Sequence, residues 1–268
     1  MTESYLIIGG DKRQELLKNI LTDKGKDVFH IRYPADAVEL DYAEKYSHIV
    51  LPIPLTKDNK TVYSSESELK ITLEKLYSKL CKHHKIYLGG ELSDSDFNSM
   101  NFMKDKAFKK ANAMLTSQGA LRLLLDNTED YIIGKKVLII GFGDVAVTLA
   151  ELFFRIGCEV NITARNPKQL MIASFSGYKA VKLKADENNL SYYDYIFGTV
   201  PCNILTENDI VSMKDSAVYF ELASFPFNAD KELFIRNNKK YVFGSALPGR
   251  FLPEASARLI ADFILTSQ

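Results

Sequence analysis

The chain has 268 residues, of which 46% are hydrophobic and 25% charged, and this composition excludes a disordered, collagenous or coiled-coil protein. Lysine plus arginine equals aspartate plus glutamate at 34 each, so no overall charge directs the chain to nucleic acid or to an anionic membrane. Its three cysteines are widely spaced and form no CxxC pair, which argues against a disulfide framework and fits a reducing cytoplasm. The amino-terminal segment turns polar after the short apolar run Tyr5–Ile8, so we expect neither a signal peptide nor a membrane span.

In the first half of the chain, short runs of strand-forming residues alternate with helical patterns. Apolar residues recur at three and four within Lys12–Leu21 and Ser67–Leu80, which predicts helices there. Such alternation is typical of βα units and a parallel sheet. The predicted strands are Tyr5–Ile8, Val28–Ile31, His48–Leu51 and Lys85–Leu88.

The middle of the chain, Asn112–Asp126, predicts a rigid connecting helix. It carries apolar side chains at Met114, Leu121, Leu124 and Leu125 and contains no proline- or glycine-rich tract that would make a flexible linker.

The second half has six predicted strands, which is the number in a complete Rossmann sheet. They are Lys136–Ile140, Cys158–Thr163, Ala180–Leu183, Tyr195–Val200, Ala217–Leu222 and Tyr241–Phe243. After them, Pro253–Leu265 predicts a helix with one apolar face and a proline in its first turn, which we expect to return to the first domain.

These elements predict an α/β protein with two Rossmann- or flavodoxin-like parallel-sheet domains and an interdomain cleft. We expect residues 1–111 to form a domain for substrate or partner binding and residues 112–128 the interdomain helix. Residues 129–245 are expected to form the NAD(P)-binding Rossmann domain, and residues 246–268 the C-terminal crossover helix.

A glycine-rich loop follows the strand Lys136–Ile140 and opens a helical pattern. Gly141 permits a tight turn, Gly143 lets the backbone approach a pyrophosphate, and Ala146 is small enough for close packing of helix on strand. Asp144 and Val145 complete the loop at the amino end of the helix, where backbone N–H groups would face phosphates. The alternative interpretation is a βα turn that binds no ligand.

The second strand of this half ends Thr163-Ala164-Arg165-Asn166, without an acidic residue. An acid at this place usually binds the ribose 2′-hydroxyl of NAD, whereas an arginine suits the 2′-phosphate of NADP. Arg165 can bind that phosphate with two parallel hydrogen bonds, and Asn166 can add a neutral donor. We therefore expect NADP as the cofactor, with NAD as the alternative; a solvent-exposed arginine with no ligand is the other interpretation.

Several segments together resemble the A subunit of dipicolinate synthase, an enzyme that makes pyridine-2,6-dicarboxylate. The resemblance covers nearly the whole chain and depends on the order and spacing of the motifs. These motifs are Ile8–Gln14, Asn112, Thr116–Gly119, Gly141–Gly143, Ala164–Arg165, Thr199–Pro201, Leu222–Ser224, Leu247–Gly249 and Pro253.

The chain departs from this family at a few of those places, as a divergent member would. Asp144 and Ala146 stand where the family tends to have arginine and glycine, Gln118 where it has glutamate, and Phe225–Phe227 in place of a glycine-rich segment. A similar Gly-x-Gly-Asp-Val loop occurs in S-adenosylhomocysteine hydrolases, which hold NAD, so Asp144 does not exclude a cofactor.

The resemblance implies a cytoplasmic, NADP-dependent oxidoreductase that oxidises dihydrodipicolinate to dipicolinate during sporulation. It also implies a second, flavoprotein-like subunit, and we expect a homo-oligomer. Candidates for binding the small dicarboxylate substrate are Gly10, Arg13, Thr116, Ser117, Gln118, Ser224 and Arg250. Further cofactor contacts are expected at Val200, Pro201 and Pro248.

Two alternatives stay open. One is another NADP-dependent dehydrogenase of small carboxylates, similar to the shikimate dehydrogenase group, although its catalytic lysine and aspartate cannot be placed here. The other is a non-catalytic nucleotide-binding or scaffold protein, which Asp144, Gln118 and the altered loop after Ser224 favour. No general base can be assigned, and the four histidines predict no metal site.

Overall fold

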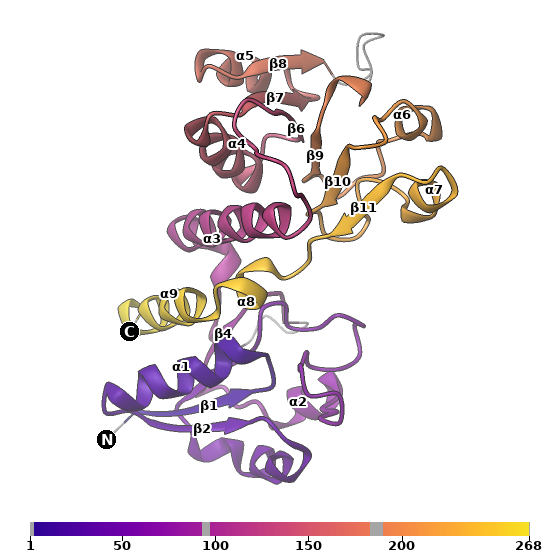
Figure 1. Ribbon diagram of the computed structural model, residues 1–268. Coiled ribbons are helices and arrows are strands. Elements are labelled where there is room, and N and C mark those ends of the chain that lie inside the picture. The colour runs from indigo at the N-terminus through magenta and orange to yellow at the C-terminus, as the bar shows by residue number, and fades with distance from the viewer. Residues whose placement is uncertain (1–2, 93–96, 183–189, 268) are drawn as a thin grey trace. The chain divides into compact units, whose positions relative to one another are not determined.

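The computed structural model describes residues 3–92, 97–182 and 190–267 (Figure 1). The chain divides into two compact units, one formed by Met1–Asn112 with Pro248–Gln268 and the other by Ala113–Leu247. Within the described residues, we find no helix that is both long enough and apolar enough to span a bilayer.

In the described part of the first unit, five strands form a parallel sheet in the order β2-β1-β3-β4-β5. This is the strand order of flavodoxin-like folds. The strands are β1 (Ser4–Ile8), β2 (Asp27–Ile31), β3 (His48–Val50), β4 (Lys85–Leu88) and β5 (Ser99–Asn101). The α-helices around them are α1 (Lys12–Asp23), α2 (Leu73–Lys79) and α9 (Pro253–Thr266), with 3₁₀ segments at Pro34–Lys45 and Phe102–Lys104.

Side chains from both faces of this sheet are buried, as expected for parallel strands covered on two sides. Leu6 and Ile8 of β1 pack into one core cluster, and the alternate residues Tyr5 and Ile7 pack into the other. The second cluster also contains apolar residues of α1 and α9, which lie side by side in Figure 1. The C-terminal helix therefore returns to the first unit, as predicted from the sequence.

In the described part of the second unit, six strands form a parallel sheet in the order β11-β10-β9-β6-β7-β8. Counted from its own first strand this is the classic Rossmann order, and the order reverses between β6 and β9. The strands are β6 (Lys136–Ile140), β7 (Glu159–Ala164), β8 (Lys179–Lys182), β9 (Tyr195–Gly198), β10 (Val218–Glu221) and β11 (Lys240–Phe243).

α4 packs against β6 and β7, α5 against β7 and β8, and α7 against β11 and α6 (Figure 1). The helices are α4 (Asp144–Ile156), α5 (Pro167–Phe175), α6 (Glu207–Val211) and α7 (Lys231–Arg236), with a 3₁₀ turn at Leu190–Tyr192. The chain passes from the first unit to the second within the long helix α3 (Lys106–Leu125). It returns to the first unit within α8 (Leu247–Phe251).

The predicted α/β class with two parallel-sheet domains is confirmed, and most strands lie within two residues of their predicted bounds. The helix predicted for Ser67–Leu80 was too long. The structure begins α2 at Leu73 because Thr72 caps it, accepting a hydrogen bond from the Lys75 N–H at 3.1 Å. The connecting helix begins earlier than predicted, β5 was not predicted, and Leu183 lies outside the described residues.

Candidate functional site

The first glycine turn, after β1, is closed by residues of its own unit. Gly9 and Gly10 both have positive φ angles, of 62° and 89°. The Gly10 N–H donates to the Tyr63 carbonyl at 2.7 Å, and the Gly10 carbonyl accepts from the Ser65 N–H at 2.7 Å. Because both polar backbone groups of Gly10 are occupied, this turn offers no backbone donor there for a substrate.

Arg13 is likewise held within the first unit. It is 4% exposed, and its Nε and Nη2 atoms each donate to the Asp11 carboxylate at 2.8 Å, while Nη2 also donates to the Ile53 carbonyl at 2.6 Å. Burial raises the pKa of Asp11, but the hydrogen bonds and charge of Arg13 outweigh it and the net pKa is lowered. A Cβ atom on Gly249 would lie 2.8 Å from the Nε atom of Arg13, so α8 passes close to this ion pair. These contacts favour a structural role for Arg13.

The second glycine turn, after β6, has a different character. Gly141 has a φ of 116°, and a Cβ there would lie 2.5 Å from Oγ1 of Thr199 and 2.7 Å from Cγ2 of Val200. By contrast, a Cβ on Gly143 would meet no atom within 4 Å. Gly143 is the N-cap of α4 and has no side chain with which to cap it, whereas Asp11 caps α1. The amino end of α4 therefore faces open space at Gly143.

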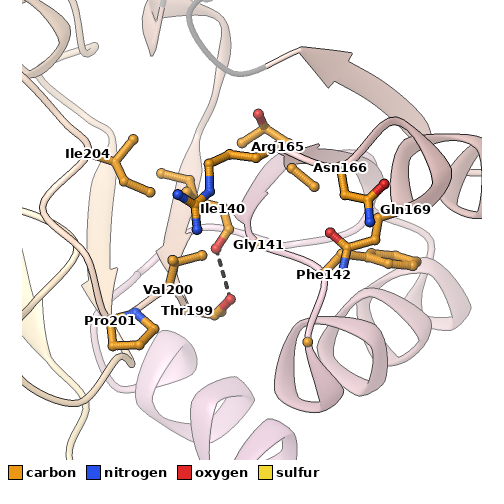
Figure 2. A pocket seen from close by; sticks show the side chains of 13 residues that line it. Ile140, Gly141, Phe142, Arg165, Asn166, Gln169, Thr199, Val200, Pro201 and Ile204 are labelled. Atoms are coloured by element: carbon orange, nitrogen blue, oxygen red, sulfur yellow. Dashed lines mark hydrogen bonds between the residues drawn. The ribbon is translucent and has the colours of Figure 1, made fainter.

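A pocket of about 650 Å³ lies against this turn (Figure 2). That volume is within the usual range for small-molecule sites. The carboxyl ends of β6, β7 and β9 form its walls, so it lies where the strand order reverses, the usual ligand position in open α/β sheets. Its lining residues are Ile140, Gly141, Phe142, Gly143, Thr163, Ala164, Arg165, Asn166, Gln169, Thr199, Val200, Pro201 and Ile204.

Among the described lining residues, Arg165 alone is cationic and none is acidic. Its side chain is exposed and extends over the pocket toward the Val200 side in Figure 2. The neighbouring Thr163 is 3% exposed, and its Oγ1 atom has no hydrogen-bond partner in the structure. The Asn166 side-chain oxygen is occupied as the N-cap of α5, accepting from the Lys168 N–H at 3.0 Å, whereas its NH₂ group can still donate. This end of the pocket therefore offers a ligand the Arg165 guanidinium and the Asn166 NH₂ group, whereas the Thr163 hydroxyl is buried.

The ends of β6 and β9 are tied together across the pocket floor. The Thr199 hydroxyl donates to the Ile140 carbonyl at 2.8 Å, drawn as the dashed line in Figure 2. This bond holds Val200 and Pro201 beside the Gly141 turn. Sequence motifs had indicated Val200 and Pro201 but not Phe142, Gln169 and Ile204, whose places in the lining depend on the paths of loops and helices.

The remaining predicted cofactor residues do not line the pocket. Asp144, Val145 and Ala146 form the first turn of α4, where Ala146 is fully buried and Asp144 is exposed. Pro248 belongs to the first unit.

The predicted substrate residues divide between the two units. Thr116, Ser117 and Gln118 lie on α3 in the second unit. Ser117 is 2% exposed, and its hydroxyl bonds to the Ala113 carbonyl at 3.0 Å and to Oγ1 of Thr148 at 2.7 Å. Thr116 is half-buried and Gln118 is exposed.

Two further substrate candidates have exposed side chains. Ser224 follows β10 in the second unit, and Arg250 lies on α8 in the first, with its guanidinium 4.6 Å from the centre of the Phe251 ring. Neither residue lines the pocket.

One cluster of metal-type ligands does occur in the described residues, at Cys81, His83 and His84. The Nδ1 atom of His84 accepts from the Cys81 N–H at 2.9 Å, and its Nε2 atom lies 3.1 Å from the Ala43 carbonyl. Both ring nitrogens of this buried histidine are therefore occupied by backbone groups. Burial lowers the pKa of His84, which favours the neutral ring that these two bonds require.

Comparison with known proteins matches each unit to a described family. Residues 4–95 match the N-terminal domain of the dipicolinate synthase A subunit. The resemblance to that family is confirmed. Residues 114–243 match the NAD binding domain of S-adenosyl-L-homocysteine hydrolase, the same family whose loop resembles residues 141–145.

The resemblance extends along the whole chain. The chain is 22% identical over 277 residues to the dipicolinate synthase A subunit of Bacillus subtilis (strain 168), and the match covers 96% of this chain and 93% of that protein. The crystal structure of the A subunit from Bacillus halodurans superposes with a TM-score of 0.82 at 22% identity, covering 99% and 97% of the two chains. The crystal structure of the Bacillus subtilis protein gives 0.80 at 20% identity, covering 100% and 96%. These structures share the two-domain α/β fold.

Proposed function

We propose that this chain is an NADP-dependent oxidoreductase of the dipicolinate synthase A type, which oxidises dihydrodipicolinate to dipicolinate in spore formation. The observation that carries the proposal is the open space at Gly143, at the amino end of α4 and against a pocket whose one described cation is Arg165. The match of residues 114–243 to an NAD binding domain supports it.

The residues of the pocket suit a dinucleotide with a 2′-phosphate. The first turn of α4 would hold the pyrophosphate, because its N–H groups and the helix dipole favour negative charge and no Cβ blocks the approach at Gly143. Arg165 would bind the 2′-phosphate at the end of β7, the strand end at which Rossmann domains bind the adenosine ribose. When bound, NADP supplies the hydride acceptor.

The substrate loses one hydride and one proton and becomes an aromatic pyridine. Because aromatisation supplies driving force, positioning matters more in this reaction than a strong base. Arg250 can offer a paired donor to a carboxylate, and Ser224 and Gln118 can donate neutral hydrogen bonds. An amide cannot titrate, so we assign no proton transfer to Gln118. Gly10, Arg13 and Ser117 are already engaged within their own units.

The assay follows NADPH formation from NADP⁺ and freshly generated dihydrodipicolinate. We expect slow turnover by the chain alone and faster turnover after a flavoprotein-like second subunit is added, because no titratable base has been found among the candidate substrate residues. Full turnover by the chain alone would contradict the need for a second subunit. Measured NADPH binding without turnover, even with the second subunit present, would favour the non-catalytic alternative.

A further inference from the structure

A fully buried carboxylate, Glu221, ends β10 and has no role in the site described above. Its Oε1 atom accepts from the Ala223 N–H at 3.1 Å. Its Oε2 atom accepts from the Asn228 and Ala229 N–H groups at 2.9 and 3.2 Å and from the Tyr219 hydroxyl at 3.1 Å. Burying a charge is costly unless it is hydrogen-bonded; burial raises the pKa of Glu221, and these four donors counter part of that rise. The carboxylate thus holds both ends of the loop between β10 and α7.

Asn228 connects this loop to the wall of the pocket. The side-chain NH₂ group of Asn228 donates to the Cys202 carbonyl at 3.1 Å, and the backbone carbonyl of Asn228 accepts from the Ile204 N–H at 2.9 Å. Ile204 and its neighbour Pro201 line the pocket at the end of β9. The position of this wall therefore depends on a loop that Glu221 holds in place.

The network is packed tightly against β9. A Cβ atom on Gly198, the last residue of β9, would lie 2.1 Å from the Tyr219 hydroxyl and 2.8 Å from Asn228. The same hydroxyl lies 3.1 Å from Glu221 and 3.3 Å from Oδ1 of Asn228. A movement of the loop would therefore be transmitted to the end of β9.

We propose that Glu221 is a positioning residue that acts through Asn228 to fix the pocket wall that receives the nicotinamide half of the dinucleotide. In Rossmann domains the adenosine ribose is bound at the end of the second strand, which here is β7 with Arg165. The nicotinamide half of the dinucleotide therefore lies toward the β9 wall. Asn228, which Glu221 holds through its backbone N–H, bonds to Cys202 and Ile204, and both lie on the β9 side of the pocket. This inference rests on the proposed function, since it requires that the pocket bind NADP(H).

Two ligands separate a positioning role from a merely structural one. NADPH occupies both halves of the pocket, whereas adenosine 2′,5′-bisphosphate lacks the nicotinamide half. The variant Glu221→Gln keeps the size of the side chain but replaces one acceptor oxygen by an NH₂ group, which cannot accept the backbone N–H bonds on that side. By calorimetry we expect NADPH to bind this variant roughly tenfold more weakly and the bisphosphate to bind within about twofold of the unmodified chain.

Asn228→Ala is expected to give the same selective loss, because it removes the bond to Cys202 while leaving the carboxylate in place. It also tests the link if Glu221→Gln does not fold. The matched control is Asn161→Ala, which removes another fully buried polar side chain, on β7, that bonds to the Val137 and Glu159 carbonyls. We expect this control to lower the melting temperature without changing the ratio of the two affinities.

Equal weakening of both ligands in Glu221→Gln and Asn228→Ala, or no weakening of either, would overturn the positioning role. Failure of the unmodified chain to bind either ligand would instead overturn the proposed function, and with it this inference.

Discussion

Replacing Gly143 by valine is expected to abolish dinucleotide binding while leaving the second unit folded. The backbone at Gly143 has φ −84° and ψ −175°, an extended conformation that valine adopts without strain. A Cβ there meets no atom within 4 Å, so the added side chain would occupy the space that we assign to the pyrophosphate. The perturbation therefore falls on the ligand and not on the protein core.

The expected effect on stability is small. As an N-cap, valine is less favourable than glycine by at most about 1 kcal/mol. Valine also lowers the conformational entropy of the unfolded chain, which stabilises the folded state by about 0.4–1 kcal/mol. The melting temperature should therefore change by less than about 4 °C. For binding, losing two hydrogen bonds to charged phosphate at about 1.5 kcal/mol each corresponds to a more than roughly hundredfold weaker affinity.

The assay pairs thermal melting with calorimetric titration of NADPH, and Gly141→Ala provides the contrast. At a φ of 116° an alanine strains the backbone, by about 1–3 kcal/mol, and its Cβ would overlap Thr199 and Val200. We expect Gly141→Ala to lower the melting temperature clearly and Gly143→Val to leave it nearly unchanged. Unchanged NADPH binding by Gly143→Val would show that the phosphate-binding loop has been misplaced.

Two further substitutions test the cofactor preference and the pH dependence. Arg165→Ala should weaken NADPH binding roughly tenfold to hundredfold, through the lost charge-assisted bonds to the 2′-phosphate, and leave NADH binding unchanged. The control Arg155→Ala removes an exposed arginine of α4 that pairs with Glu151, and it should change the binding of neither nucleotide. As the pH drops through about 6.5 the free energy of unfolding is expected to fall, and His84→Gln should make this fall less steep by up to about 1.4 kcal/mol per pH unit. His83→Gln, at an exposed neighbouring residue, should leave the slope unchanged.

The sign of the pH effect follows from burial of His84, which lowers its pKa in the folded chain. The unfolded chain then takes up the proton first as the pH falls, so stability is present above the ordinary histidine pKa and is lost below it. Protonation would also remove the Nδ1 acceptor of the Cys81 N–H. Urea unfolding at several pH values measures the slope, and an unchanged slope in His84→Gln would contradict this reasoning. For Arg165→Ala, a retained preference for NADPH would contradict the assigned phosphate contact.

The strands could be predicted from the sequence because parallel strands buried on both faces are continuous apolar runs. Lys136–Ile140 is such a run, and all its residues after Lys136 are buried. Ser99–Asn101 could not be recognised, because this strand is three residues long, lies at the sheet edge and carries no fully buried side chain.

The two glycine turns look alike in the sequence, and only the fold separates them. The turn at Gly10 is closed by Tyr63 and Ser65, more than fifty residues further along the chain, a contact that no local pattern indicates. Glu221 was overlooked for a related reason, since its bonding partners lie mostly in the following loop. An acid inside the apolar run Val218–Ala223 was the signal that could have identified it.

A crystal structure of the chain with bound NADP⁺ tests most directly whether the second unit holds this cofactor in the pocket between the ends of β6, β7 and β9. We expect the pyrophosphate at the amino end of α4, over Gly143, and the 2′-phosphate against Arg165. A dinucleotide bound elsewhere on the chain, or bound in this pocket with its 2′-phosphate away from Arg165, would contradict the proposed site.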